Sequence, residues 1–269
     1  MTELQSKARE LRRMIVRLSH ATRTAHLGSA LSCADILVAA YSGGLNCSCE
    51  RPDDPERDRL VFGKGHCAVA LVCALARHGY CSFDELLTTF NMNGGLQEHP
   101  NYRCVPGVEN ASGSLGHALP IGLGMALAAR IQGNGGRRVC VVMGDGECNE
   151  GSVWEAAMLA GGQRAANLCA VVDFNRWQAT GRSCDITALE PLADKWRAFG
   201  WETVECDGHD PDALRGLLRA FGKGGRPFAI VAHTVKGKGV SFMEDDNNWH
   251  YRIPNDAELA GALAALGEA

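Results

Sequence analysis

Short apolar runs alternate with longer segments of helical periodicity through the second half of the chain. The runs are short, continuous and rich in β-branched residues, as is typical of strands covered on both faces. The predicted strands are 137–143, 167–174, 201–206 and 227–233, and the predicted helices are 115–131, 152–163, 191–199 and 211–221. This alternation predicts βαβ units, and therefore an α/β fold with a doubly wound, mostly parallel sheet and helices on both faces.

The first hundred residues carry more helical than strand pattern. We predict helices at about 3–20, 32–42 and 66–78, a strand at 60–62, and a last Ala-rich helix over 255–269. No internal repeat, low-complexity segment or clear linker interrupts the chain. Because 269 residues lie near the upper size for one hydrophobic core, we expect a single domain over residues 1–269.

Composition and charge restrict the partners. With 46% hydrophobic and 22% charged residues the chain is typical of globular proteins, and its net charge of −4 supplies no basic field for nucleic acid or an anionic membrane. Any phosphate group must therefore be bound locally. No run of eighteen apolar residues and no leader-like segment is present, so we expect a cytoplasmic protein.

The 12 cysteines do not form a metal motif. No Cys-x-x-Cys pair occurs, and Cys47-Ser-Cys49 lacks a second half at ligand spacing. We interpret most of these thiols as small core residues in a reducing compartment.

Oxygen donors follow two consecutive predicted strands. Asp145 comes directly after the first strand, and Asn175, thirty residues later, follows the next. That spacing allows one right-handed crossover, which would set both side chains at the same edge of the sheet. Mg²⁺ prefers such oxygen ligands and is usually held by one or two carboxylates together with a ligand's phosphates. The pair therefore predicts a Mg²⁺-diphosphate site.

The turn between strand and helix suits a phosphate. Gly146 permits close approach to the backbone, and a helix that starts near Gly151 would point unpaired N–H groups at the anion. Taken alone, however, Gly144-Asp145-Gly146 is also compatible with an ordinary tight turn.

Several motifs together resemble the transketolase family. The segment GDGECNEGSVWEAAMLA, followed by Asn175, resembles the thiamine-diphosphate motif in its transketolase form. Further pieces agree with that family in order along the chain: AHLGSALS (25–32), VFGKGHCAVAL (61–71), EHP (98–100), ASGSLGHALPIGLGMALA (111–128), TVKGKGVSF (234–242) and NNWHYRIPN (247–255).

The resemblance covers nearly the whole chain but only part of a one-chain transketolase. It implies the thiamine-diphosphate-binding fold, in its diphosphate-binding domain, and the N-terminal subunit of a split transketolase. We expect the pyrimidine-binding and C-terminal domains on a partner subunit that carries the Glu which activates the cofactor, in an α2β2 heterotetramer. The implied activity is transfer of a two-carbon ketol unit from a ketose, as its phosphate, to an aldehyde, with Mg²⁺ and thiamine diphosphate as cofactors.

The resemblance also implies residue roles. The metal ligands are the side chains of Asp145 and Asn175 and the backbone carbonyl of Trp177. The residues implied in cofactor binding are His66, Gly113, Ser114, Leu115, Gly116, His117, Gly144, Asp145, Gly146, Glu147, Asn175 and His250.

Four histidines occupy positions that the family uses for proton transfer and for the donor's hydroxyls: His26, His66, His99 and His250. Glu150 corresponds to an acid that meets its symmetry mate across the dimer, and we expect it to serve communication between sites. No matched motif supports a catalytic role for the histidines at 20, 78, 209 and 233.

Departures from the family pattern fall around the donor side of the pocket. Leu27 stands where the family usually has Pro, Glu98 and Ala118 where it usually has Gly, and Tyr251 follows His250 in place of Gly. These changes are compatible with an unusual sugar or acceptor, or with drift at the rim.

Other interpretations remain open at this point. A thiamine-dependent 2-oxo acid decarboxylating component is also split into two chains, and deoxyxylulose-phosphate synthase shares pieces of these motifs. A cofactor-free scaffold is the non-enzymatic alternative, and it predicts no thermal shift with Mg²⁺ and thiamine diphosphate.

Overall fold

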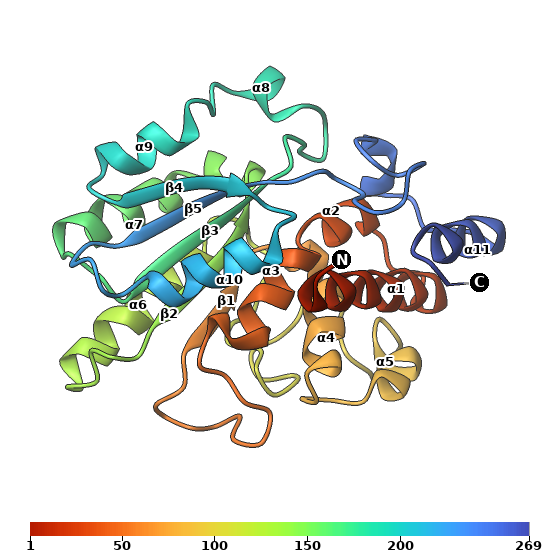
Figure 1. Cartoon of the computed structure of the whole chain (residues 1–269), viewed down its shortest axis with the longest axis horizontal. Coiled ribbons are helices and arrows are strands. Elements are labelled where there is room, and N and C mark those ends of the chain that lie inside the picture. The colour runs from red at the N-terminus through yellow and green to blue at the C-terminus, as the bar shows by residue number, and fades with distance from the viewer. Residues whose placement is uncertain (269) are drawn as a thin grey trace.

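The computed structural model describes residues 1–268, and its centre is a five-stranded parallel sheet. Its strands are β1 (Arg59–Phe62), β2 (Val139–Gly144), β3 (Leu168–Phe174), β4 (Glu202–Asp207) and β5 (Phe228–His233). They lie in the order β1-β2-β3-β5-β4 (Figure 1). All four neighbouring pairs are parallel, which confirms the predicted sheet.

Helices cover both faces of this sheet (Figure 1). One side carries α1 (Glu3–Thr22), α2 (Leu27–Ser32), α3 (Ala34–Ala39), α4 (Ala68–Arg77) and α10 (Pro211–Ala220). Helices α5 (Phe83–Thr89) and α11 (Asp256–Ala265) pack against α1. The other side carries α6 (Ala118–Ile131), α7 (Gly151–Gly162) and α9 (Leu192–Ala198). Short helical segments complete the chain: a π-helical turn (Ala40–Gly44), α8 (Ser183–Ile186), and 3-10 turns at Gly65–Cys67, Gly146–Asn149 and Asn247–His250.

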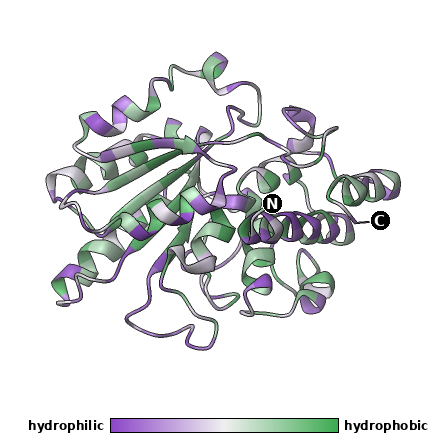
Figure 2. Ribbon diagram, viewed as in Figure 1, coloured by the Kyte–Doolittle hydropathy of each residue, from purple (hydrophilic) through white to green (hydrophobic). Residues whose placement is uncertain are grey.

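The central strands divide their side chains between two hydrophobic cores. In β2, Cys140 and Val142 pack into the core under α1 and α4, whereas Val139 and Val141 pack into the core under α6 and α7. Every residue of β3 is buried. Figure 2 shows these strands as the most hydrophobic part of the ribbon. Burial on both faces explains why the strands appear in the sequence as continuous apolar runs.

Two predicted helices differ from the structure, and one helix of the structure was not predicted. The predicted helix 32–42 is two short helices and a π-helical turn, because the chain changes direction at Cys33 and Gly43 takes a positive φ of 90°. The helix predicted at 115–131 begins only at Ala118, after Gly116, whose φ is 84°. Helix α5 was not predicted, although Ser82 caps it by accepting the N–H of Glu85, a spacing visible in the sequence.

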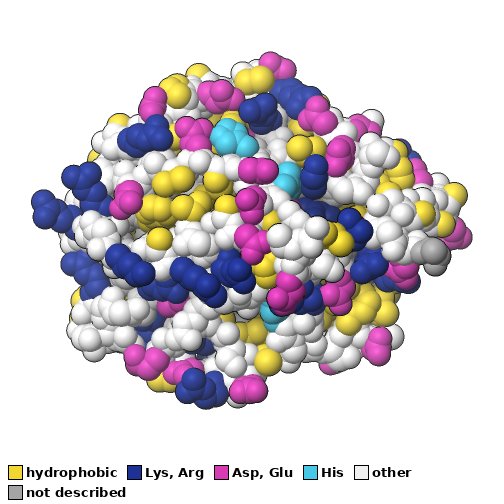
Figure 3. Space-filling view, viewed as in Figure 1, with side chains coloured by type: hydrophobic (Ala, Val, Ile, Leu, Met, Phe, Trp, Pro, Cys, Tyr) yellow, Lys and Arg dark blue, Asp and Glu magenta, His cyan; other side chains and the backbone are white. Residues whose placement is uncertain are grey.

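Charged side chains of both signs are spread over the face shown in Figure 3, in keeping with the small net charge. Across residues 1–268, no helix combines the length and the apolar character needed to cross a bilayer.

Candidate functional site

A cavity of about 250 Å³ opens at the carboxyl ends of β2 and β3. Most predicted site residues line it, together with residues that the motifs did not single out. The lining residues are Ser29, Lys64, His66, Gly113, Leu115, Gly144, Asp145, Gly146, Glu147, Asn175, Trp177, Gln178, Ala179, Thr180 and His250. A larger hollow of about 500 Å³ lies at the opposite edge of the sheet, and none of the predicted site residues lines it.

Asp145 follows β2 directly and is almost fully buried, with 1% of its surface exposed. Its backbone N–H donates to the carbonyl of Asp173 on β3, and its Oδ2 accepts a 2.6 Å hydrogen bond from Ser183 Oγ. Burial raises the pKa of this carboxyl to about 6 because the cavity offers its charge too little solvation. A cation in the cavity would reverse this effect, so the carboxylate fits a metal ligand.

Asn175 and Trp177 line the same cavity from the end of β3. The Asn175 amide donates to Ser32 Oγ at 3.2 Å and accepts the Trp177 N–H at 3.0 Å, which fixes the turn that both residues share. The Trp177 ring is held from outside, because its Nε1 donates to Asp245 and the guanidinium of Arg182 lies 3.9 Å from the ring centre. The strand-tip end of the cavity, formed by Asp145, Asn175 and Trp177, is therefore rigidly built.

The expectation that α7 points its first N–H groups at the anion is wrong. The 3-10 turn Gly146–Asn149 lies between β2 and α7, and it is this turn, through Gly146 and Glu147, that lines the cavity. The first turn of α7 instead contacts the loop that precedes α6, where Ser152 Oγ donates to the carbonyl of Gly116 at 2.8 Å.

The glycine-rich loop before α6 is fastened by Glu147. Glu147 Oε1 accepts the N–H of Gly116 at 3.1 Å, and burial raises the pKa of this carboxyl to about 7. Gly113 and Leu115 reach the cavity wall from this loop. Ser114 and His117 are exposed and Gly116 is buried behind the wall, so the structure does not place these three residues against the cavity.

Lys64 is a buried cation at the middle of the cavity wall, with 1% of its surface exposed. It pairs with the carboxylate of Asp173 on β3 and donates to the carbonyl of Ser29 at 2.8 Å. Burial disfavours the charged lysine, but the attraction of Asp173 outweighs this effect, and the pKa of Lys64 is raised. The lysine therefore remains a cation beside the predicted diphosphate site.

Lys236 supplies a second buried ammonium group, near His250. Its Nζ lies 2.6 Å from Asn247 Oδ1 and 3.2 Å from His250 Nδ1. Burial lowers the pKa of Lys236 to about 8, because no carboxylate pairs directly with it among residues 1–268. An anion bound nearby would favour the charged form.

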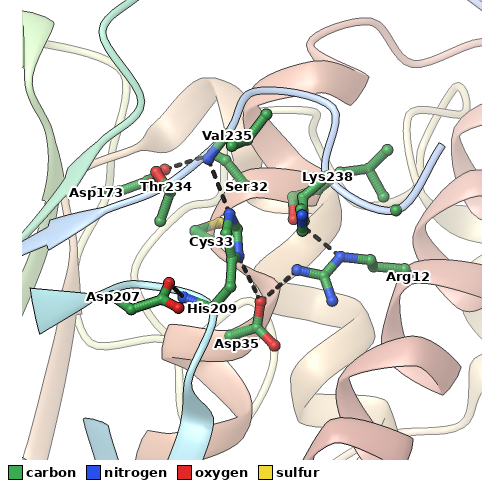
Figure 4. A network of polar contacts seen from close by, with 12 residues as sticks. Arg12, Ser32, Cys33, Asp35, Asp173, Asp207, His209, Thr234, Val235 and Lys238 are labelled. Atoms are coloured by element: carbon green, nitrogen blue, oxygen red, sulfur yellow. Dashed lines mark hydrogen bonds and ion pairs between the residues drawn. The ribbon is translucent and has the colours of Figure 1, made fainter. Parts of the chain in front are cut away.

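A polar network holds the segment that carries Lys236 (Figure 4). His209 Nε2 accepts the N–H of Val235 at 2.8 Å, and His209 Nδ1 lies 2.8 Å from Asp35, which also pairs with Arg12. Thr234, the residue before Val235, donates a hydrogen bond from its Oγ1 to the carboxylate of Asp173. His209, which no motif singled out, thus serves to position this segment.

The four predicted catalytic histidines meet in one cluster, which we call the histidine cluster. The ring of His26 lies at its centre, with ring centroids 4.9 Å from His250, 5.4 Å from His66 and 6.5 Å from His99. Only His66 and His250 also line the cavity wall. Burial, together with nearby cations and imidazoles, lowers the pKa of His66 well below its ordinary value and that of His250 to about 3. Both rings are therefore neutral at physiological pH.

The backbone at His26 is strained. Its φ of 64° lies in the left-handed region, which a non-glycine residue rarely adopts. The backbone N–H of His26 donates to the carbonyl of His250 at 2.9 Å, which holds this conformation. Strain of this kind persists where the surrounding structure enforces it, often at functional sites.

The donor set of the cavity fits a metal diphosphate. Glu147 Oε2 and Gln178 Nε2 are buried without a hydrogen-bond partner, and both residues line the cavity. Lys64 supplies positive charge at the cavity wall and Lys236 lies beside His250, while Asp145 and Asn175 supply hard oxygen atoms. Within residues 1–268 no three His, Cys, Asp or Glu side chains gather as a metal site, so an ion here would also need the Trp177 carbonyl and oxygens of the bound ligand.

Several of these residues were missed from the sequence. Lys64 and Lys236 lie inside segments that carry the family resemblance, but a sequence does not reveal which lysine is buried. Asp173 is the only charged residue in an otherwise apolar strand. A single acid in such a strand could have indicated a buried carboxylate that needs a partner. Gln178 lies in a loop and Ser183 begins the short helix α8, and nothing in the sequence pointed to either residue.

Comparison with known proteins identifies the family. The model of the family described as "Transketolase, thiamine diphosphate binding domain" matches residues 4–268. The chain is 39% identical over 265 residues to one subunit of an apulose-4-phosphate transketolase from Actinobacillus succinogenes, covering 98% of this chain and 96% of the relative. It is 40% identical over 266 residues to one subunit of a 6-deoxy-6-sulfo-D-fructose transketolase from a Clostridium species, with 98% and 96% covered.

Solved structures agree with this assignment. The chain superimposes on a transketolase from Campylobacter jejuni with a TM-score of 0.90 and 25% identity, covering 100% of this chain but 43% of that one. The chain thus spans less than half the length of that solved transketolase and nearly the full length of the relatives named as separate subunits. The chain belongs to the transketolase family of thiamine diphosphate-dependent transferases, and it corresponds to the family's thiamine diphosphate-binding domain.

Proposed function

We propose that this chain is the N-terminal subunit of a split transketolase that transfers a two-carbon ketol unit from a ketose to an aldehyde acceptor. The observation that carries the proposal is the cavity in which two strand tips, the buried Lys64 and two histidines of the cluster meet, with Lys236 beside His250. Thiamine diphosphate, when bound, supplies the carbanion chemistry that breaks and forms carbon–carbon bonds beside a carbonyl.

The strand-tip end would hold the diphosphate and its Mg²⁺. We assign the metal to the side chains of Asp145 and Asn175 and to the backbone carbonyl of Trp177, all at the cavity wall. Lys64 and Lys236 would neutralise the diphosphate, and the unpaired amide of Gln178 would donate to one of its oxygens. This division gives the buried amide of Gln178 an acceptor of matching chemistry.

The histidine cluster would act on the sugar. His66 and His250 are neutral and line the cavity, so their rings can accept or donate hydrogen bonds to the hydroxyls of a ketose. His26, in contact with both rings, would exchange a proton with the substrate oxygen. His99 completes the cluster from the loop that precedes α6.

The partner subunit would cover the exposed apolar face of α6 and α7. These helices pack together and leave Ile121 (36% exposed), Met158 (59%) and Leu159 (51%) at the surface. Leu115, at the cavity, is also 38% exposed. Contiguous apolar residues at a surface are typical of an interface. We assign this face to a partner that carries the pyrimidine-activating Glu, in an α2β2 assembly where Glu150 serves communication between sites.

The substrates proposed are phosphorylated ketoses with aldehyde acceptors. The names of two relatives contain apulose-4-phosphate and 6-deoxy-6-sulfo-D-fructose, both sugars with an anionic group. Such a group would lie on the partner side, because the cations of this cavity are placed toward the diphosphate. The whole chain would then act as one diphosphate-binding unit, and the partner would select the sugar.

The decisive experiment compares the lone chain with the reconstituted pair. Purified chain is assayed for ketose-phosphate cleavage with Mg²⁺ and thiamine diphosphate, with and without a C-terminal transketolase subunit encoded beside it. We expect negligible turnover alone and robust turnover for the pair. Robust turnover by the lone chain, or pyruvate-dependent acyl transfer by the pair, would overturn the proposal.

A further inference from the structure

Glu98 faces the central ring of the histidine cluster. Its Oε1 lies 3.4 Å from His26 Nδ1, and the side chains are 29% and 15% exposed, respectively. Within residues 1–268, no other carboxylate lies within 4.0 Å of a ring nitrogen of the cluster, since the remaining His–acid pairs involve His20, His209 and His233.

The two facing atoms depend on each other. His26 Nδ1 and Glu98 Oε1 are both buried without a hydrogen-bond partner among residues 1–268, and they face each other at 3.4 Å. The contact with His26 lowers the pKa of Glu98, so the carboxylate is charged and can only accept a hydrogen bond. His26 must therefore carry its proton on Nδ1 to satisfy the pair.

The other rings of the cluster lack this contact. His250 faces the ammonium group of Lys236 at 3.2 Å. The pKa of His66 is lowered by burial and by the positive charge of Lys64. Tyr251 contacts His26 and His250 with its ring. Glu98 thus distinguishes His26 chemically from its three neighbours.

We propose that Glu98 is a positioning residue for His26: its carboxylate holds the proton on Nδ1, so that Nε2 is the nitrogen that accepts a proton from the substrate. Only the kinetic consequence of this inference rests on the proposed function. The tautomer itself is a property of the chain alone.

The backbone is arranged to support this contact. The left-handed conformation of His26 and the hydrogen bond from its N–H to the His250 carbonyl fix the direction in which its side chain leaves the chain. A rotation of the ring would place a carbon at the position of Nδ1 and remove the ring nitrogen that faces Glu98 Oε1 at 3.4 Å.

The test uses ¹⁵N-histidine-labelled protein, because ring ¹⁵N chemical shifts distinguish the two neutral tautomers. The wild-type chain is expected to show His26 as the Nδ1–H form at a pH where the ring is neutral. E98A and E98M remove the acceptor, and E98M also keeps the volume, so both should shift His26 toward the Nε2–H form. E98Q retains an acceptor oxygen and should keep the wild-type tautomer.

Kinetics in the reconstituted pair give the second measurement. We expect E98A and E98M to lower kcat about tenfold while the donor KM changes less than about twofold, and E98Q to recover most of kcat. E205A is the matched control, because Glu205 forms an equivalent carboxylate–histidine contact with His233, 2.9 Å long, outside the histidine cluster. It should change neither the His26 tautomer nor kcat.

The outcomes separate the two proposals. An unchanged Nδ1–H tautomer in both E98A and E98M would overturn the role of Glu98, whatever the enzyme's activity. A pair without ketol transfer whose E98A and E98M variants still switch tautomer would overturn the proposed function and leave the Glu98–His26 contact supported.

Discussion

The two ends of the cavity are built in different ways. At the strand-tip end, Asp145 and Asn175 follow neighbouring parallel strands whose register places Gly144 opposite Asp173. The histidine cluster instead gathers rings from four separate segments, at residues 26, 66, 99 and 250, through loops and short turns. A sheet fixes the first end through its backbone, whereas the second depends on contacts between side chains, such as that of Glu98 with His26.

This contrast assigns binding and proton transfer to different residues. The strand-tip end carries oxygen donors and cations suited to a metal diphosphate, while the other end carries imidazoles, of which His66 and His250 are held neutral. Substitutions at the two ends should therefore affect different measurements.

Lys64 lines the cavity that the two ends share, and its loss should have the largest effect. Lys64→Met leaves the carboxylate of Asp173 buried without its ion-pair partner, which should cost about 3–5 kcal/mol of unfolding free energy. Chemical denaturation measures this cost. Arg77→Met is the control, because it breaks an ion pair with the exposed Glu10 and should cost about 1 kcal/mol or less. Equal losses in the two variants would contradict a buried ion pair at Lys64.

The histidine end is tested by kinetics. His26→Ala and His250→Ala should each lower turnover of the reconstituted pair by about 10² or more, the scale for a positioned proton-transfer group. Cofactor affinity should change much less, as titration calorimetry would establish. His20→Ala, at a surface ion pair with Asp256, should leave turnover unchanged. Full activity in both cluster variants would require the four rings to be reassigned.

The strand-tip end is tested by binding. Asp145→Ala removes a charged ligand and should weaken binding of thiamine diphosphate with Mg²⁺ by about 2 kcal/mol or more, or roughly 30-fold. Titration calorimetry on the same reconstituted pair gives the affinity. Asp194→Ala, an acid paired with Arg197 at the surface, is the control. Equal cofactor affinity in wild type and Asp145→Ala would contradict the metal assignment.

Near neutral pH, where His250 has barely begun to titrate, the smallest expected effect is a pH dependence of stability. The folded chain holds the pKa of His250 at about 3, below the ordinary value of 6.5, so the unfolded chain binds more protons between these values. This histidine's contribution to stability is therefore present above pH 6.5 and is lost as the pH falls toward 3. His250→Asn should lose less stability than wild type over this window, as urea unfolding at several pH values would measure. Parallel loss in both proteins would contradict the shift.

Sequence reasoning succeeded where the backbone alone decides position. The strands and the placement of Asp145 and Asn175 at one cavity follow from apolar runs and one crossover length. It failed where a local turn intervened, because the 3-10 turn Gly146–Asn149 moves the start of α7 away from the cavity. Contacts between distant side chains, such as Lys64 with Asp173, leave no periodic trace in a sequence.

The most direct test of the account locates the metal. A structure of the chain with thiamine diphosphate and Mn²⁺ in place of Mg²⁺ would reveal the ion by its anomalous scattering. The account predicts one peak in contact with the side-chain oxygens of Asp145 and Asn175 and with the Trp177 carbonyl. A bound cofactor whose ion lies elsewhere, or strand tips that make no contact with it, would contradict the account.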